Sequence, residues 1–451
     1  MLHKFKFDGT KIILDVHSGA VHLVDNLVWD LLEDYRQITD EELVRKCGQK
    51  YDRTSVLEAV GEIKTLEGSG LLFSPDPYQD AYCPPAKVEV KSLCLHLAHA
   101  CNLRCRYCFA GQGQFGGAAD LMPLETGRRA IDFLIHRSGG RKHLEVDFFG
   151  GEPLLNFNVL KDLVEYGHKQ GNLAGKAFTF TLTTNALFLD QEVTRYLNDQ
   201  DINVVLSLDG RREVHDAMRV TAMGAGTYDL VLARVRDFVN SRGGSNYIIR
   251  GTFTRHNLDF CSDVLHLANL GFEHLSVEPV VALEEADYAI RADDLPLVYH
   301  EYERLTRELL RRVQTRQQVN FFHFNIDLDG GPCLPKRLSG CGAGHEYMAV
   351  APNGDLYPCH QFVGRERYLI GNVAGEDFNA GIADTFRRAH VYNKEKCAGC
   401  WAKFYCSGGC HANADLFNGS IFKPYQLGCA ITQKRLECAI YFKAKTQAGQ
   451  M

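Results

Sequence analysis

Residues 92–108 read SLCLHLAHACNLRCRYC, an apolar strand followed at once by three cysteines. Cys101, Cys105 and Cys108 supply three thiolates and leave one position of a four-coordinate centre open. Thiolate-only sets suit iron–sulfur clusters as well as zinc, so the spacing alone leaves a zinc knuckle as the alternative. A 4Fe–4S cluster held in this way would have one iron free to take a small chelating ligand.

The composition places this motif in an ordinary globular chain with too many cysteines. The chain has 451 residues, a net charge of −6 and 16 cysteines. An acidic balance argues against nucleic-acid binding, which depends on cationic contacts to phosphates. The sequence has neither a run of 18 apolar residues nor an apolar signal-peptide core, so we expect no membrane partner and a cytoplasmic location. Cytoplasmic thiols stay reduced, and clustered cysteines there more often bind metal or do chemistry.

Residues 1–80 predict a separate small domain that resembles a winged helix-turn-helix. Asp8-Gly9 is a hairpin turn signal, and Thr39 with Glu42 forms a capping box at the start of a helix. We expect three strands, three short helices and a further strand over Leu71–Phe73. Acidic stretches make DNA binding a poor fit, and peptide capture on an exposed strand edge suits the module better. The segment Ser74–Pro85, with four prolines, is the expected linker.

Residues 86–320 alternate strands and helices, which predicts a parallel sheet of βα units. The expected strands are 90–97, 144–149, 177–183, 204–208, 247–253 and 274–280. Six units are too few for the closed eight-unit barrel, so we expect an α/β fold with a partial (β/α)6 barrel. Ligand chemistry would then lie at the carboxyl ends of the strands.

Residues 321–451 predict a third domain, loop-rich and held by metal, in which helices are scarce. Pro352-Asn353-Gly354-Asp355 is a tight hairpin turn. Seven cysteines are spread over this region at ligand spacing: Cys341, Cys359, Cys397, Cys400, Cys406, Cys410 and Cys429. Two zinc sites are the alternative to iron–sulfur clusters here, because thiolate spacing does not separate the two metals.

A second motif follows the second barrel strand. Phe148-Phe149-Gly150-Gly151-Glu152-Pro153 combines two glycines, which let a ligand approach the backbone, with a carboxylate at a strand end. Taken alone, a Gly-Gly-Glu sequence is usually a turn. Beside three cysteines it fits a site for an amino group that chelates iron.

The two motifs together resemble the radical S-adenosylmethionine (SAM) enzymes. The resemblance implies that SAM ligates the open iron and that the reduced cluster cleaves it to a 5′-deoxyadenosyl radical. It also implies that Gly150, Gly151 and Glu152 hold the amino group of SAM and that Arg219 pairs with its carboxylate. The other implied SAM contacts are Tyr107, Thr184, Asn185, Ser207 and Asp209. A capped turn at Asp209 and a solvated charge at Arg219 are the alternatives.

The C-terminal cysteines resemble the SPASM extension, which implies two auxiliary 4Fe–4S clusters and three in all. The resemblance assigns Cys341, Cys359 and Cys410 to the first, and Cys397, Cys400, Cys406 and Cys429 to the second. Cys333 is a fourth ligand of the first cluster, or else that position is open for a substrate thiol, which we favour. The other cysteines, Cys47, Cys83, Cys94, Cys261 and Cys438, are expected to be small buried apolar residues. His96, His99 and His360 lie near the expected site, but none is identified as a general base.

An N-terminal peptide binder, a radical SAM core and a SPASM extension together resemble maturases of ribosomally synthesised peptides. Residues 95–117 and 342–364 resemble the thioether-forming maturases of peptides with six cysteines in forty-five residues. This implies a Cys-rich precursor peptide and an electron donor such as flavodoxin or ferredoxin as partners. The alternatives are a sulfatase-type maturase that forms formylglycine and a non-catalytic, zinc-organised adaptor. The acceptor residue, the number of bridges and the oligomeric state are not predicted.

Overall fold

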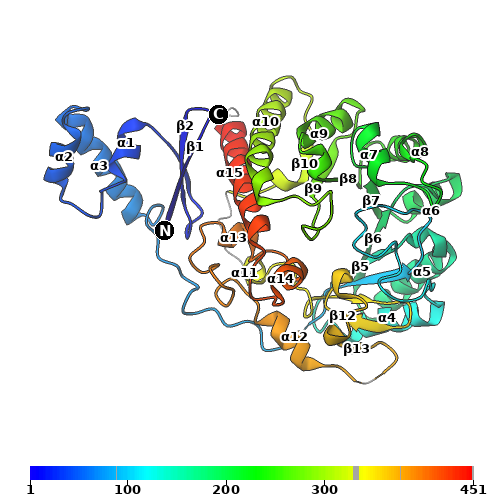
Figure 1. The fold of residues 1–451 in the computed structure, drawn as a ribbon. Helices are drawn as coiled ribbons and strands as arrows, with labels where there is room; N and C mark the ends of the chain where they lie inside the picture. Colours follow the sequence, from blue (N-terminus) through cyan, green and yellow to red (C-terminus); the bar gives the residue numbers. More distant parts are fainter. Residues whose placement is uncertain (88, 329–334, 376, 449–451) are drawn as a thin grey trace.

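The structure is a computed structural model that describes residues 1–87, 89–328, 335–375 and 377–448. Within these residues the centre of the molecule is a ten-stranded sheet in the order β10-β9-β8-β7-β6-β5-β4-β11-β12-β13 (Figure 1). Neighbouring strands from β4 to β9 pair in parallel and follow chain order. Their bounds are β4 (Ser92–Ala98), β5 (His143–Gly150), β6 (Ala177–Thr184), β7 (Asn203–Ser207), β8 (Tyr247–Phe253) and β9 (His274–Pro279). The α/β fold with six parallel strands is therefore confirmed.

Helices cover the outer face of this sheet (Figure 1). On β6, Phe178, Phe180 and Leu182 belong to the main apolar core, whereas the alternate threonines are more exposed or face the other side. This period-two pattern puts the apolar residues against the helices and leaves the inner face more polar. The helices are α4 (Leu124–Arg137), α5 (Phe157–Leu173), α6 (Gln191–Asp199), α7 (Arg212–Met218), α8 (Tyr228–Ser241), α9 (Phe260–Asn269) and α10 (Leu295–Gln314). Of these, α7 was not expected from the sequence.

The N-terminal domain has three antiparallel strands and three helices, with a core of its own. The elements are β1 (Leu2–Phe7), β2 (Thr10–Asp15), β3 (Val21–Val24), α1 (Asn26–Leu31), α2 (Asp40–Cys47) and α3 (Arg53–Gly68). The capping box of Thr39 and Glu42 is present. The strand expected over Leu71–Phe73 is absent: this described segment makes bends, and Phe73 has a φ of 55°, which breaks an extended strand.

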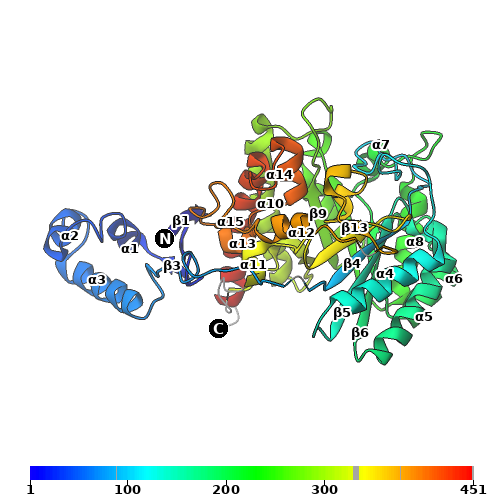
Figure 2. The ribbon, with the colours of Figure 1, turned by 90° about the horizontal axis from the view of Figure 1, so that it is seen from below.

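The N-terminal sheet packs on the rest of the molecule, while α1–α3 project away from it (Figure 2). The ring of Phe7 stacks on Tyr441 at 4.2 Å, and the ring of His3 stacks on Trp401 at 3.7 Å. The face of the N-terminal sheet that carries His3 and Phe7 is therefore covered by the C-terminal region.

The C-terminal region extends the central sheet and is richer in helix than the sequence indicated. β11 (Tyr347–Val350) pairs with β4 in parallel, and β12 (Asp355–Tyr357) returns through the expected hairpin turn, followed by β13 (Gly371–Asn372). At the other edge, β10 (Asn320–Phe321) pairs with β9. The helices are α11 (Pro335–Ser339), α12 (Ala380–Arg387), α13 (Lys403–Cys406), α14 (His411–Asn418) and α15 (Gln426–Ala448).

The expectation that helices are scarce after residue 320 is therefore wrong. The long helix α15 packs against α10 on one side and against β1 and β3 on another. Because α15 is covered from several directions, its apolar residues are not confined to one stripe, and the usual amphipathic signal is missing. No helix in the described part of the chain is long and apolar enough to cross a membrane.

Candidate active site and cysteine clusters

The first three cysteines lie in the loop that follows β4, at the carboxyl end of the parallel strands. Cys101, Cys105 and Cys108 are all partly buried. Burial, together with the negative charges of Glu152 and the two other thiolates, raises the pKa of Cys101 to about 11. The structure therefore brings the three predicted thiols together beside the predicted carboxylate.

The donor set fits an iron–sulfur cluster. Buried thiols with raised pKa values stay protonated unless a metal cation compensates their charge. Cys101, Cys105 and Cys108 could each bind one iron of a 4Fe–4S cluster, which would leave the fourth iron open for a ligand.

Gly150, the last residue of β5, and Gly151, which follows it, allow this strand end to touch the cysteine loop. Gly150 has a φ of 126°, which a residue with a side chain rarely adopts. A Cβ on Gly151 would lie 2.2 Å from the carbonyl oxygen of Ala100. The same carbonyl accepts the N–H of Glu152 at 2.9 Å. This close approach leaves no room for a side chain at Gly151 and places Glu152 next to Cys101.

The carboxylate of Glu152 is fully buried and held by neutral donors. The hydroxyl of Thr184 donates at 2.8 Å, the N–H of Asn185 at 2.8 Å and the N–H of Leu154 at 3.1 Å. Burial raises the pKa of Glu152 to about 7 despite these bonds. No ion pair joins Glu152 to another described residue, so its buried charge fits an ammonium group supplied by a ligand. This is the chemistry that the amino group of SAM would bring.

Asp209, Tyr107 and Arg219 form a second buried polar group near the cysteine loop. The Tyr107 hydroxyl donates to Asp209 at 2.5 Å, and the Thr252 N–H donates to it at 3.1 Å. The Arg219 guanidinium pairs with Asp209 at 3.1 Å. Burial lowers the pKa of Arg219, but the charges of Asp209 and Tyr107 outweigh it and keep the pKa above its ordinary value. Arg219 already has a carboxylate partner, so its contact with the SAM carboxylate stays a prediction.

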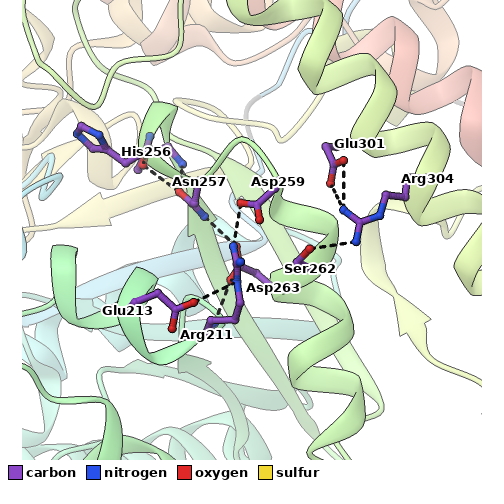
Figure 3. Close-up of polar contacts among 10 residues, drawn as sticks. Arg211, Glu213, His256, Asn257, Asp259, Ser262, Asp263, Glu301 and Arg304 are labelled. Atoms are coloured by element: carbon purple, nitrogen blue, oxygen red, sulfur yellow. Dashed lines mark hydrogen bonds and ion pairs between the residues drawn. The ribbon is translucent and has the colours of Figure 1, made fainter.

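A network that the sequence did not reveal supports the loop that carries Asp209 (Figure 3). Arg211 binds the fully buried Asp263 through its backbone N–H at 3.0 Å and through Nε at 2.8 Å. It reaches Asp259 at 2.8 Å, and Asn257 donates to Asp263 at 3.0 Å. A Cβ on Gly210 would lie 2.4 Å from Asp263. The start of α9 thus fixes the turn after β7, where the predicted contacts Ser207 and Asp209 lie.

The seven C-terminal cysteines fall into two groups. Burial raises the pKa of Cys359, and the nearby thiolates of Cys410 and Cys341 raise it further. Burial raises the pKa of Cys397 to about 12, and the nearby thiolates of Cys406, Cys429 and Cys400 contribute to this increase. The structure thus gathers the same two sets that the family pattern assigns, although their ligand roles stay predictions.

A buried cation lies between the two groups. The Lys394 side chain is 3% exposed and donates to the carbonyl of Gly408 at 2.8 Å. Burial lowers its pKa, while the thiolates of both groups, Cys397 and Cys406 in one and Cys341 and Cys410 in the other, oppose that effect. The amino group therefore sits where it can offset negative charge from both sets.

The remaining cysteines divide by burial. Cys333 lies outside the described residues. Cys94, Cys261 and Cys438 are buried, as expected for small apolar residues. Cys47 is only partly buried, because it lies at the border of the small N-terminal core. Cys83 is exposed in the linker, so the expectation that it is buried is wrong: the linker runs over the surface and offers no core for it.

The histidines near the site are held as neutral residues. His96 and His99 contact each other at 3.1 Å between ring nitrogens. Burial lowers the pKa of His99 to about 4 and that of His360 to about 4. Nε2 of His96 is buried without a hydrogen-bond partner in the described structure. The geometry identifies no general base.

Two family models match the chain. A 4Fe–4S single cluster domain matches residues 91–226, and the SPASM iron–sulfur cluster-binding domain matches residues 341–401. Fold, cysteine loop and cluster domain together define a radical SAM fold with a C-terminal SPASM domain. Both models describe iron–sulfur cluster binding, which agrees with the cysteine pattern of the two matched regions.

Several curated proteins are similar in sequence. The mycofactocin maturase MftC of Mycolicibacterium smegmatis is 27% identical over 342 residues, 72% of this chain and 80% of that protein. A cysteine-type anaerobic sulfatase-maturating enzyme of Clostridium perfringens is 23% identical over 74% of this chain and 90% of that protein. An uncharacterized protein of Methanocaldococcus jannaschii is 32% identical over 130 residues, and that match spans 42% of its length.

Two solved structures share the fold. Native anSMEcpe with bound AdoMet superposes with a TM-score of 0.66 at 19% identity, covering 80% of this chain and all of that one. SuiB of Streptococcus suis, bound to S-adenosylmethionine, superposes with a TM-score of 0.54 at 16% identity, covering 95% of this chain and 98% of that one.

Proposed function

We propose that this protein installs thioether crosslinks in a Cys-rich precursor peptide. The observation that carries the proposal is the way the two cysteine regions face each other. The residue after Cys108 and the residue after Cys359 are in ring contact, Phe109 with His360 at 5.7 Å between centroids. A thiol held by the Cys341, Cys359 and Cys410 group would therefore lie across a short gap from the SAM-binding loop.

The proposed reaction removes two hydrogen atoms from the peptide, that is, two protons and two electrons. When bound, SAM and the reduced cluster supply a 5′-deoxyadenosyl radical, which takes one hydrogen atom from a C–H bond of the acceptor residue. A cysteine S–H loses its proton, and a C–S bond forms. SAM cleavage would consume one electron from the donor, and formation of the C–S bond would release one, which clusters held by the C-terminal cysteine groups would accept. The two hydrogen atoms lost by the peptide are then balanced by methionine, deoxyadenosine and a proton.

The residues of the chain would bind and orient the reactants. Glu152 would pair with the SAM amino group, which its burial and lack of a described cation partner favour. The Asp209 carboxylate, fixed by Tyr107 and Arg219, would meet the ribose side of SAM. Buried Lys394 would offset the negative charge of the two auxiliary groups.

The N-terminal sheet offers an edge for the leader of the peptide. β1 and β3 are the two edge strands of this sheet: each pairs with β2 on one side and, among the described strands, with none on the other, and α15 packs against both. We place the leader on β3. Leu23 on β3 is 45% exposed. An added strand would pair with this edge through main-chain hydrogen bonds. We propose flavodoxin or ferredoxin as the electron donor.

The two alternatives have less support. A sulfatase-type maturase would not need the N-terminal domain, and anSMEcpe is covered in full while leaving a fifth of this chain unmatched. SuiB matches 95% of this chain, and it has also been solved with its precursor peptide SuiA. A zinc-organised adaptor would leave the Gly150-Gly151-Glu152 strand end and the buried Arg219–Asp209 pair without a role.

The test uses reconstituted enzyme, SAM, a reductant and a cysteine-containing peptide. We expect a product two hydrogens lighter per bridge, one deoxyadenosine per bridge and one cysteine per bridge that no longer reacts with iodoacetamide. Loss of sulfur from the peptide would indicate formylglycine instead. An unchanged peptide mass across a panel of Cys-rich peptides would contradict the proposal.

A further inference from the structure

Three aromatic side chains connect the two cysteine regions. Phe109, Phe149 and His360 form this group, which we call the ring bridge. Phe109 lies 5.7 Å from His360 and 6.5 Å from Phe149, and Phe149 lies 5.0 Å from His360, all between ring centroids. Each ring comes from a different element of the site: the loop after Cys108, the end of β5 beside Gly150, and the turn after Cys359.

The ring bridge is supported from behind and open on one side. Phe115, 9% exposed, packs against Phe109 at 5.9 Å. Cys108, Phe149, Phe115 and Cys359 belong to one apolar cluster. Phe109 itself is 55% exposed, although both of its chain neighbours and its ring partners are wholly or partly buried. An exposed ring within an otherwise covered apolar cluster has a free face for a ligand.

The position of this free face determines what can cover it. A peptide that spans both reacting groups must cross the gap between the Cys101 loop and the Cys359 group, and the ring bridge crosses the same gap. The part of it that faces outward is the hydrocarbon ring of Phe109, and the neighbouring ring of Phe149 is a hydrocarbon as well. A neutral residue would lose little hydration on this surface, whereas a charged one would lose much more.

We infer that the ring bridge is the surface on which the acceptor residue of the peptide rests, and that this acceptor is neutral. The inference deepens the proposed function and rests on it. Phe109 acts as a positioning residue: it holds the acceptor carbon over the SAM site. Without its ring, SAM is still cleaved, but the radical is less often transferred to the correct carbon.

The experiment compares Phe109→Ala with Phe109→Tyr and with a control, Leu230→Ala. Leu230 is 64% exposed on α8, away from the cysteine regions. We measure iron content, SAM cleavage without peptide, peptide Kd by fluorescence anisotropy, and crosslinks per deoxyadenosine. Phe109→Ala should keep the first two, weaken peptide binding and lower crosslinks per deoxyadenosine by about tenfold or more, the scale of losing one buried aromatic contact. Phe109→Tyr should keep most of the coupling, and Leu230→Ala all of it.

Two results would overturn the inference. One is a Phe109→Ala enzyme that crosslinks as efficiently per deoxyadenosine as Leu230→Ala. The other is a mapped acceptor that carries a charge. If Phe109→Ala loses iron, the same measurements are made on Phe149→Leu, whose residue lies on β5. Iron loss in both variants would mean that the rings have a structural role, and this result would also overturn the inference.

Failure of the proposed function is distinguishable from failure of the ring bridge. An enzyme that crosslinks no peptide would end the proposed chemistry, yet the peptide Kd would still decide whether Phe109 contacts the peptide. A Kd unchanged in Phe109→Ala relative to Leu230→Ala overturns the ring bridge whatever the reaction is.

Discussion

The buried pair Asp76–Lys403 should decide whether the linker and the N-terminal domain stay docked. Lys403 Nζ lies 2.7 Å from Asp76, with side chains 1% and 6% exposed. Asp76 also accepts from the Tyr392 hydroxyl at 2.9 Å, and the His17 ring lies 3.6 Å away. Lys403 opens α13, between Cys400 and Cys406, so this pair joins the linker directly to the second auxiliary group.

The change is Lys403→Met, which keeps the length of the side chain and removes its charge. Breaking a buried ion pair by removing one partner costs about 3–5 kcal/mol, because the other charge stays buried without compensation. Asp76 keeps its hydrogen bond from Tyr392, so we expect the lower value, about 3 kcal/mol. Adding Asp76→Asn removes the stranded charge and should recover part of this loss.

The assay is hydrogen–deuterium exchange of the linker and of β1 and β2, because a protein with clusters does not unfold as two states. A loss of about 3 kcal/mol corresponds to local opening that is about a hundredfold more frequent. Lys50→Met is the control: it breaks an ion pair with Asp30 whose side chains are 72% and 30% exposed, and no measurable change is expected. Unchanged linker exchange in Lys403→Met, or equal effects of the two substitutions, would refute the reasoning.

Three further predictions concern the cofactor sites. Because burial raises the pKa of Glu152 to about 7, SAM affinity should increase between about pH 6 and about pH 8 as the carboxyl ionises. Equilibrium dialysis should show that Glu152→Gln binds SAM more weakly and independently of pH. A wild-type affinity that does not change with pH would contradict this prediction. By the same shift, Glu152 lowers the stability of the SAM-free protein as pH rises from about 4.5 to about 7, since its native state holds the proton more tightly. Gly151→Ala should abolish detectable SAM binding, because its Cβ would overlap the Ala100 carbonyl; Gly117→Ala, whose Cβ would meet an atom at 3.6 Å, is the control and should bind normally. Cys400→Ala and Cys410→Ala should each remove up to about four iron atoms per chain, and the two losses should add in the double variant, whereas substitution of the buried Cys438 by Ala should remove none. Equal iron content in all three single variants would contradict the assignment of the cysteines to two groups.

Much of the fold followed from local sequence patterns. The alternation of apolar residues in β6 and the Asp8-Gly9 turn act over a few residues, so they are visible without the rest of the chain. The capping box at Thr39 is equally local. Helix α15 was missed because it is covered on several sides, and α7 because seven residues carry too little periodicity to stand out. The bends at residues 71–73 depend on the positive φ of Phe73, and a phenylalanine in the sequence gives no signal of a positive φ.

The sequence identified the thiols of the candidate site, whose ligand roles stay predictions, but not the residues that support the site. Cysteine spacing named the thiols, since metal chemistry restricts which residues can bind. The Arg211–Asp263 network was not predictable, because its partners are 52 residues apart in sequence and meet through the packing of α9 on the turn after β7. The exposure of Cys83 likewise depends on where the linker runs.

The sequence by itself determined that this chain has a parallel α/β core, three thiols after its first barrel strand and seven more near its C-terminus. Those features are local, and composition and spacing carry them. Only the tertiary structure decided that Arg219 pairs with Asp209, that a buried lysine lies between the two C-terminal cysteine groups, and that aromatic rings connect the two cysteine regions. Each of these depends on side chains far apart in the chain, and their distances are set by the sheet and the helices packed on it.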